Sequence, residues 1–471
     1  MLWLSLSLVF LLWVVSVPLL ASPDEPANFV KGAAVVRGDF VGEYVAPEQL
    51  KSYWTTIVDI DPQFGSVNAL PWCFAPYPDK NACTYEVATA PQVDGVAWTN
   101  MGRYPPLGFA LLGLGSVFGA TNDSLYAGRA IQALACVVGV ASAIQILSWR
   151  RRSVVGLLAA LTPGTVFLAS TSSPSGLEIV SAIVLWVACP VVLSGDSGRL
   201  ERLSFLVSGV VLIATRPLGA FFYLATLGAC AVFAGVSARD VLARLGRSVI
   251  VVHAGVVAFM LWWYFAIFGP ATSNPIDFGD VPLALSSRLE AIVRGLPRIV
   301  EQYVGNYGWL DTPTPGIAVV VSLGAVGLVL IKGRHSLGVG QWSTCVGLVV
   351  LAAGFTIVSD LNYYAILRTY GSQGRHVAPL LVGIPLLITS KLDRNVRTTL
   401  AVASATSVVA IWSFAVMIRR YSVGVVPGNV GDMWRDPPWS PPLGVTTTFV
   451  AIVVVTSAFA VTAWVIESDR L

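Results

Sequence analysis

The stretch "VPLLASPDEPANFVKG", residues 17–32, ends a first apolar run and opens a polar segment with an acidic pair. Asp24 and Glu25 stand between Pro23 and Pro26. Because proline ends a helix and restricts the backbone before it, the two carboxylates are expected at a fixed place beside a membrane helix. There they can meet both a lipid-borne and a water-soluble substrate. The plainer interpretation is a solvated helix end.

The composition indicates an all-α polytopic membrane protein, with residues 1–471 forming a single integral-membrane domain. The chain has 471 residues, of which 55% are hydrophobic and only 12% charged, whereas soluble domains carry about 25% charged residues. The net charge of +3 is small and is spread over several loops, so nucleic acid is not an expected partner. No G-x-x-x-x-G-K-[ST] motif occurs, so ATP is not expected to be the direct energy source.

The distribution of basic residues predicts the topology, because short cytoplasmic loops are rich in Lys and Arg. Five short basic connections, at 148–153, 195–202, 237–247, 332–335 and 391–397, alternate consistently if all of them are cytoplasmic. About twelve spans with both termini inside then follow. The predicted helices are 2–20, 123–147, 154–172, 175–193, 203–216, 217–236, 248–270, 316–331, 341–358, 377–390, 398–418 and 444–466.

This topology leaves three outer segments, at 21–104, 271–315 and 359–376, so any chemistry is expected on the outer face. The apolar run at 105–119 is short for a span, and counting it would place the basic connection at 148–153 outside. We interpret it as a re-entrant or juxtamembrane helix. The alternative is that 105–119 is a true span and that one of the other predicted helices does not cross the membrane.

Several polar side chains next to apolar runs are candidates for binding a lipid phosphate. Arg103 and Tyr104 open "RYPPLGF" at 103–109, and Arg216 lies in "ATRPLGAF" at 214–221. Arg375 and His376 precede the predicted helix at 377, whose N-terminus itself attracts anions. Guanidinium groups match phosphate oxygens. Anchoring or snorkelling at the membrane interface is the plainer role for Arg103, Tyr104 and Arg216. For His376 the plainer role is that of a hydrogen-bonding group.

The later outer loops and the cysteines suggest further site residues. In "NYGWLDTPTP", at 306–315, Asp311 follows Tyr307 and Trp309, and aromatic faces commonly support sugar rings. Cys73 and Cys83 lie in the first outer segment, where a local disulfide is expected if that segment faces an oxidising compartment. No His/Cys cluster has the spacing of a zinc site.

The layout as a whole resembles the GT-C superfamily of membrane glycosyltransferases. The resemblance rests on the acidic pair after the first helix, on "YPPLGFALLGLGSVFG" at 104–119, and on "ATRPLGAF". Within that superfamily the chain is similar to a bacterial family of predicted membrane proteins known as a domain of unknown function. Three motifs carry this likeness: "SPDEPANF" at 22–29, "YGWLDTPTP" at 307–315 and "SQGRHVAP" at 372–379. His376 departs from the aromatic residue usual there, and Asn28 stands where a histidine is common.

The resemblance implies a sugar donor carried on a polyprenyl phosphate and an acceptor glycan or lipid of the cell envelope. Asp24 would be the base, and Glu25 would orient the acceptor or hold the base. Donor phosphate would be bound by Arg216, Arg375 and Arg103, and the sugar site would involve Tyr104, Tyr307, Trp309, Asp311 and His376.

The implied enzyme inverts the anomeric centre, works in the plasma membrane with its site facing outward, and serves cell wall biogenesis. A divalent metal is left open, because superfamily members differ and no dedicated ligand set is present. The alternative function is a transporter or flippase of a lipid-linked or polar substrate. Replacing Asp24 by Asn would abolish an enzyme, but would only slow a transporter.

Overall fold

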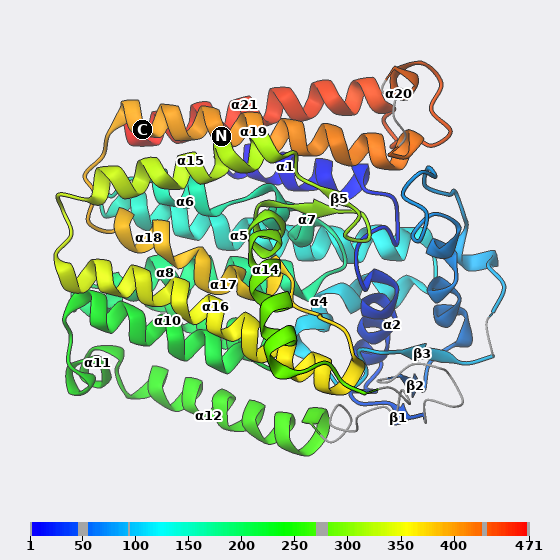
Figure 1. Cartoon of the computed structure of the whole chain (residues 1–471), viewed down its shortest axis with the longest axis horizontal. Helices are drawn as coiled ribbons and strands as arrows, with labels where there is room; N and C mark the ends of the chain where they lie inside the picture. The colour runs from blue at the N-terminus through cyan, green and yellow to red at the C-terminus, as the bar shows by residue number, and fades with distance from the viewer. Residues whose placement is uncertain (1, 46–54, 93–94, 270–280, 426–430, 469–471) are drawn as a thin grey trace.

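The computed structural model describes residues 2–45, 55–92, 95–269, 281–425 and 431–468. Its long helices run side by side along the long axis of the molecule (Figure 1). In this part of the chain, seven helices are long and apolar enough to cross a membrane, or eight if the pair α10 (Gly219–Ala234) and α11 (Ala238–Leu245), bent by 112°, is one span. The seven are α5 (Asn122–Trp149), α8 (Pro174–Ser194), α12 (Arg247–Trp263) with the π turn η5 (Tyr264–Phe268), α15 (Gly316–Gly333), α16 (Val339–Leu367), α19 (Val396–Val423) and α21 (Val445–Glu467).

The described helices therefore support seven or eight spans, and the count of about twelve stays a prediction. The other predicted spans are shorter or broken helices: α1 (Leu2–Ser16), α6 (Val155–Ala160) with α7 (Pro163–Ser170), α9 (Arg199–Thr215), and α17 (Gly374–Leu381) with α18 (Gly383–Thr389). The 15 residues of α1 rise roughly 22 Å, less than a bilayer core of about 30 Å. The break between α6 and α7 precedes Pro163, because proline disfavours helical backbone in the residue before it.

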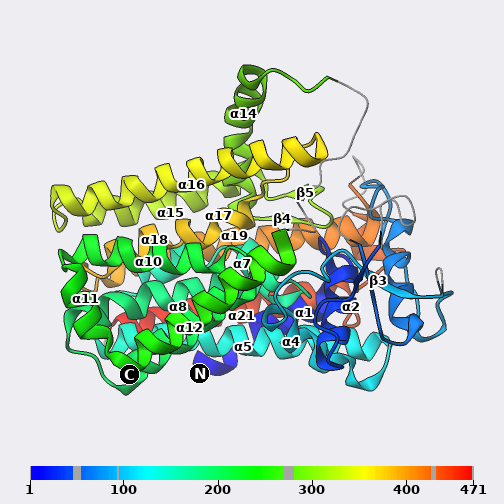
Figure 2. The same cartoon turned by 90° about the horizontal axis from the view of Figure 1, so that it is seen from below.

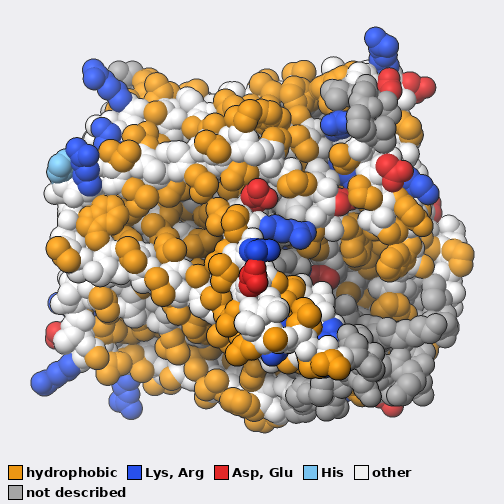
Figure 3. All heavy atoms as spheres, in the orientation of Figure 1, with side chains coloured by type: hydrophobic (Ala, Val, Ile, Leu, Met, Phe, Trp, Pro, Cys, Tyr) orange, Lys and Arg blue, Asp and Glu red, His pale blue; other side chains and the backbone are white. Residues whose placement is uncertain are grey.

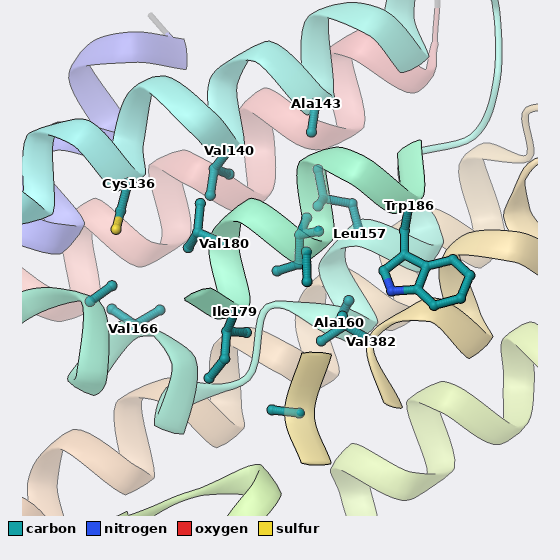
Figure 4. Close-up of a cluster of buried hydrophobic side chains, with 14 of the residues drawn as sticks. Cys136, Val140, Ala143, Leu157, Ala160, Val166, Ile179, Val180, Trp186 and Val382 are labelled. Carbon is teal, nitrogen blue, oxygen red and sulfur yellow. The ribbon is translucent and has the colours of Figure 1, made fainter. Parts of the chain in front are cut away.

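Helix α8 is the centre of the bundle and contacts α5, α7, α9, α10, α17 and α18. Figure 4 shows Ile179, Val180 and Trp186 of α8 among side chains from α5 and α6. Trp186 is fully buried and donates its indole N–H to the carbonyl oxygen of Pro379 at 2.8 Å. This bond ties α8 to α17, whose first residues lie at the candidate site.

The first predicted outer segment, 21–104, is folded rather than an open loop. It contains α2 (Glu25–Val36), the 3-10 turns η1 (Pro62–Asn68), η2 (Leu70–Cys73) and η3 (Val87–Thr89), and the antiparallel sheet β1 (Glu43–Tyr44), β2 (Thr56–Val58) and β3 (Ala97–Thr99). Thr56 pairs with Thr99, and a disulfide joins Cys73 to Cys83. Residues 46–54 and 93–94 of this segment lie outside the described residues.

The short apolar run at 105–119 forms α4 (Leu107–Gly115) and the 3-10 turn η4 (Ser116–Phe118). Helix α4 packs against α2, α5 and α9. Gly32 of α2 and Gly113 of α4 face each other so closely that a methyl group on either would overlap the other's backbone. The crossing places α2, and with it the acidic pair, against the bundle.

The other two predicted outer segments also contain helix. The second holds α14 (Leu285–Val304) and the hairpin β4 (Asn306–Tyr307) and β5 (Thr312–Pro313); its residues 271–280 lie outside the described residues. Helix α14 runs across the direction of the long helices in Figure 1 and stands away from the bundle in Figure 2. The third, predicted as a loop at 359–376, begins inside α16, which continues to Leu367. The 29 residues of α16 rise roughly 43 Å, so this helix is longer than the bilayer core.

The molecular surface is mainly hydrophobic across the face seen in Figure 3, with several Lys and Arg side chains at its left end. The α15–α16 and α18–α19 connections and α11 lie at that end (Figure 1). These segments carry basic stretches that the sequence assigned to the cytoplasm. The short helix α20 (Asp432–Arg435) lies at the opposite end, as do α2 and the small sheet.

Candidate functional site

The turn between α1 and α2 is held in an unusual conformation by distant parts of the chain. Leu20 has φ 59° and Asp24 has φ 62°, values that non-glycine residues seldom adopt. The carbonyl oxygens of residues 19, 20 and 21 accept hydrogen bonds from side chains of other elements, namely Tyr85, Trp309 and Tyr421. Because strained backbone persists only where its surroundings determine it, these bonds fix the position of Asp24.

Glu25 is a buried anchor of the same turn. Its carboxylate oxygens lie 2.6 and 2.7 Å from Nε and Nη2 of Arg129, and both side chains have 0% exposure. The backbone N–H groups of Ser22 and Ser172 also donate to it, at 3.2 and 3.0 Å. Burial raises the pKa of the Glu25 carboxyl, but the charge and hydrogen bonds of Arg129 and the two N–H groups outweigh this and bring the pKa below its ordinary value.

Glu25 was predicted either to orient the acceptor or to hold the base, and the first of these alternatives is corrected. A carboxylate with no exposed surface and with both oxygens occupied cannot contact a substrate. Glu25 instead holds the backbone beside Asp24. Arg129 completes this anchor by donating to the carbonyl oxygens of Val14, Val17 and Pro18 at the end of α1.

Asp24 and Arg375 form an ion pair at the surface of a pocket. Nη2 of Arg375 lies 2.7 Å from Oδ2 of Asp24, and the side chains are 10% and 34% exposed. Arg375 is held at the start of α17, where Asp360 accepts hydrogen bonds from the backbone N–H groups of Gly371 and Ser372 at 2.9 and 2.7 Å. The structure thus brings together two predicted site residues that are 351 positions apart in the chain.

The pocket beside this pair also contains Arg216. Nη1 of Arg216 donates to Oγ of Ser175 at 2.8 Å and lies 3.8 Å from the buried carboxylate of Glu178. The two arginines give the pocket a positive side. We name it the Arg216 pocket; its lining is Asp24, Asn28, Met101, Tyr104, Phe109, Ser173, Pro174, Ser175, Arg216 and Arg375.

Tyr104 lies in this pocket, whereas Arg103 does not line it. Burial raises the pKa of the Tyr104 phenol above its ordinary value. The charge and hydrogen bond of Arg216 lower this pKa, whereas the charge of Asp24 raises it further. Arg103 is half-buried, and its backbone oxygen accepts a hydrogen bond from the indole of Trp263 at 2.9 Å. The predicted pair therefore divides, with only its tyrosine at the site.

The residues of "YGWLD" are placed away from the Arg216 pocket. Tyr307 has 0% exposure, and its ring packs against Trp13 and Phe167. Oδ2 of Asp311 lies 2.7 Å from Nη2 of the fully buried Arg420. The expected sugar platform is therefore corrected for Tyr307 and Asp311, which are packed or paired inside the protein. Trp309 is partly buried and supports the turn at Leu20.

Arg420 links Asp311 to the disulfide loop. Its guanidinium donates to the carbonyl oxygens of Phe74, Tyr77 and Lys80, at 3.1, 3.3 and 2.6 Å. The role of Arg420 was missed from sequence, although an arginine at the end of an apolar span is a signal for a partner. The same signal applies to Arg129 within 123–147.

His376 stands in the first turn of α17, and its Nδ1 accepts from the backbone N–H of Gln373 at 3.3 Å. It does not line the Arg216 pocket. Within the described residues, no group of three or more His, Cys, Asp and Glu side chains could hold a metal ion. The polar groups that line the Arg216 pocket are one carboxylate, two guanidinium groups, a phenol, the carboxamide of Asn28 and the hydroxyl groups of Ser173 and Ser175.

Comparisons with known proteins give a family and one structural likeness. A family model described as "Predicted membrane protein (DUF2142)" matches residues 6–384. Among solved structures, the crystal structure of ArnT from Cupriavidus metallidurans in the apo state is similar, with a TM-score of 0.44 and 12% sequence identity, over 99% of this chain and 77% of that chain. A search of curated proteins finds no match.

Proposed function

This chain belongs to the DUF2142 family of predicted membrane proteins, and we propose that it is a GT-C-like, extracytoplasmic glycosyltransferase. It would move a sugar from a polyprenyl-phosphate donor to a glycan or lipid acceptor of the cell envelope. The observation that carries the proposal is the Asp24–Arg375 pair, at 2.7 Å, in a pocket that also holds Arg216. A base and two phosphate ligands are the groups that such a transfer needs.

The donor phosphate would lie between Arg216 and Arg375. A guanidinium group binds phosphate oxygens in a fork and stays charged, and neither arginine is fully committed to a carboxylate. Arg216 lies 3.8 Å from Glu178, while the buried Nε of Arg375 has no hydrogen-bond partner among the described residues. Tyr104, Phe109 and Met101 would surround the first isoprene units. Arg103 lies outside this pocket, and the proposal assigns it no contact.

In the reaction, the acceptor hydroxyl attacks the anomeric carbon and its proton passes to the Asp24 carboxylate. The bond from that carbon to the phosphate oxygen breaks as the new glycosidic bond forms, and the lipid phosphate leaves with both electrons of the broken bond. Arg216 and Arg375 stabilise the charge on the leaving phosphate, as fixed donors aimed at a developing anion do. Attack opposite the leaving group inverts the anomeric centre.

The proposal places this pocket on the outer face of the plasma membrane. Support comes from the basic connections, which gather at the end away from α2 (Figure 1), and from the positive-inside rule. The interpretation with about twelve spans and cytoplasmic termini is part of the proposal. In it, the donor enters from the outer leaflet and the acceptor from the envelope.

The test is a glycan linkage analysis of the cell envelope in a deletion strain. The strain is complemented with the wild type, with Asp24→Asn, or with Asp196→Asn, which changes an aspartate that is 93% exposed. We expect one linkage to disappear on deletion and to return with the wild type and Asp196→Asn only. Restoration by Asp24→Asn would remove Asp24 as the base, and an unchanged glycan profile in the deletion strain would contradict the function.

A further inference from the structure

A second pocket adjoins the Asp24–Arg375 ion pair. It shares Arg375 with the Arg216 pocket and includes Pro23, the residue before Asp24. Its walls come from α7, α14, α17 and the β4–β5 connection. We name it the Asn306 pocket; its lining is Pro23, Gly164, Phe167, Leu168, Gln302, Asn306, Leu310, Gln373, Gly374 and Arg375.

Two buried oxygen atoms of the lining residues lack hydrogen-bond donors. Oδ1 of Asn306 and Oε1 of Gln373 have no partner within the described part of the chain. The amide orientation of Asn306 is set by its Nδ2, which donates to the carbonyl oxygen of Leu310 at 3.0 Å. Leaving a buried acceptor unpaired is costly, so the pocket favours a ligand that brings O–H donors.

The chemistry of the Asn306 pocket differs from that of the Arg216 pocket. Three carboxamides, from Gln302, Asn306 and Gln373, stand beside apolar walls that include Phe167. Its single charged lining residue, Arg375, also lines the Arg216 pocket, where the proposed donor phosphate would bind it. A ligand that is neutral, rich in hydroxyl groups and apolar on its ring face fits such a lining.

The lining residues are held in place by their neighbours. Oε1 of Gln302 accepts the backbone N–H of Gly374 at 3.1 Å, and Nδ1 of His376 accepts that of Gln373 at 3.3 Å. Gly374 lies against the backbone of residues 302–303, with no room for a Cβ atom. These contacts join the end of α14 to the start of α17 and give the pocket a defined shape.

We propose that the Asn306 pocket is the acceptor subsite, and that it binds a neutral sugar whose hydroxyl groups donate to Asn306 and Gln373. The inference rests on the proposed function and adds to it the site and the charge class of the acceptor. Asp24 then lies between the two substrates, because its carboxylate faces the Arg216 pocket while Pro23 and Arg375 border the Asn306 pocket. An acceptor hydroxyl reaching past Arg375 meets the base and the donor together.

The experiment measures binding of four neutral probes, the methyl glycosides of glucose, galactose, mannose and arabinose, to the full-length protein by NMR titration. The variants are Gln373→Met and Asn306→Ser. The matched control is Gln341→Met. Gln341 lies in the first turn of α16, is hydrogen-bonded to Phe233 and Gly338, and does not line the Asn306 pocket. We expect at least one glycoside to bind, each pocket variant to weaken it about fivefold or more, and the control to leave it unchanged. Equal binding by wild type and pocket variants, or no binding to the wild type, would overturn the inference.

A parallel titration with a polyprenyl phosphate separates this inference from the proposed function. Binding of the lipid is expected to depend on Arg216 and to persist in Gln373→Met, which also shows that this variant is folded. If the lipid binds in this way while Gln373→Met binds the glycosides as tightly as the wild type, only the inference of the acceptor subsite is wrong. If the lipid does not bind, or binds without regard to Arg216, the proposed function is contradicted.

Discussion

Nη2 of Arg375 lies 2.7 Å from Oδ2 of Asp24, although the two residues are 351 positions apart in the chain. One belongs to the turn after α1 and the other to the start of α17. The pair therefore depends on the packing of the whole bundle, and on the side chains that hold the turn at residues 19–25.

Arg216 is predicted to bind the donor phosphate, so Arg216→Gln should weaken binding of a polyprenyl phosphate by roughly 10- to 100-fold. This is the range expected for losing a hydrogen bond between charged groups. Arg216→Lys should recover only part of it, because an ammonium group cannot form the guanidinium fork. Arg199→Gln is the control; Arg199 is the exposed first residue of α9, and Arg216 follows the last residue of that helix. Fluorescence titration measures all four proteins, and equal affinities for wild type and Arg216→Gln would refute the assignment.

Glu25 is predicted to be a structural anchor. Glu25→Gln leaves the guanidinium of Arg129 buried without a counter-charge, which should lower the free energy of unfolding by about 3–5 kcal/mol. The control Glu290→Gln breaks an exposed ion pair with Arg294 and should cost less than about 1 kcal/mol. Thermal unfolding in detergent measures both. A Glu25→Gln protein as stable as the wild type would show that the anchor is unimportant.

Asp311 is predicted to support the disulfide loop through Arg420. Asp311→Asn removes the charge that pairs with Arg420, and should lower the free energy of unfolding by roughly 2 kcal/mol. Since Arg420 donates to the Lys80 carbonyl oxygen, loosening it should also speed tryptic cleavage after Lys80. Limited proteolysis followed by mass spectrometry measures the rate, with Asp196→Asn as the control. A cleavage rate unchanged by Asp311→Asn would mean that the ion pair does not hold the loop.

Lys31 gives a prediction for pH dependence. Its ammonium group donates to the carbonyl oxygens of Phe40 and Gly102 at 2.6 and 2.5 Å. Burial lowers its pKa to about 7, with Arg103 adding to this effect and Asp39 opposing it. The unfolded chain keeps the ordinary pKa of 10.5 and therefore binds more protons between these values, so stability should rise with pH across this window.

The comparison is between wild type and Lys31→Met, with the exposed Lys391→Met as the control. Between pH 7.5 and 9.5, the stability of the wild type should rise relative to Lys31→Met by about 1 kcal/mol per pH unit. Thermal unfolding at several pH values measures the difference. Parallel curves for wild type and Lys31→Met would show that this lysine is not the group responsible.

The fold class could be predicted from sequence because apolar length and basic loops are local signals. These signals predict that the bundle is helical. Which helices can span the membrane depends on the lengths of α1 and α9 and on the break before Pro163, and packing determines these lengths and this break. The segment interpreted as a loop at 359–376 is helical as far as Leu367, because α16 is longer than a bilayer core requires. Membership in the family of predicted membrane proteins was confirmed by the match over residues 6–384.

The site was only partly predictable, for a physical reason. The motif "SPDEPANF" located Asp24, and adjacent arginines suggested Arg216 and Arg375, but sequence order cannot show which acid is buried. Glu25 turns inward to Arg129, whereas Asp24 turns toward Arg375. Asp311 and Tyr307 were predicted to bind a sugar because aromatic and acidic residues are common in sugar sites, although they also stabilise the interior of a protein. Only their contacts with Arg420 and Trp13 distinguish the two roles.

The most direct test of the proposed transfer reaction incubates the purified protein with the membrane fraction of a deletion strain, which contains both the lipid donors and the envelope acceptors. Mass spectrometry follows the polyprenyl-phosphate sugar and the polyprenyl phosphate over time. We expect wild-type protein to convert the polyprenyl-phosphate sugar into polyprenyl phosphate, and Asp24→Asn to do so at least about 100-fold more slowly, because it lacks the general base. Equal rates for the two proteins, or no consumption of any polyprenyl-phosphate sugar, would contradict the proposed transfer reaction.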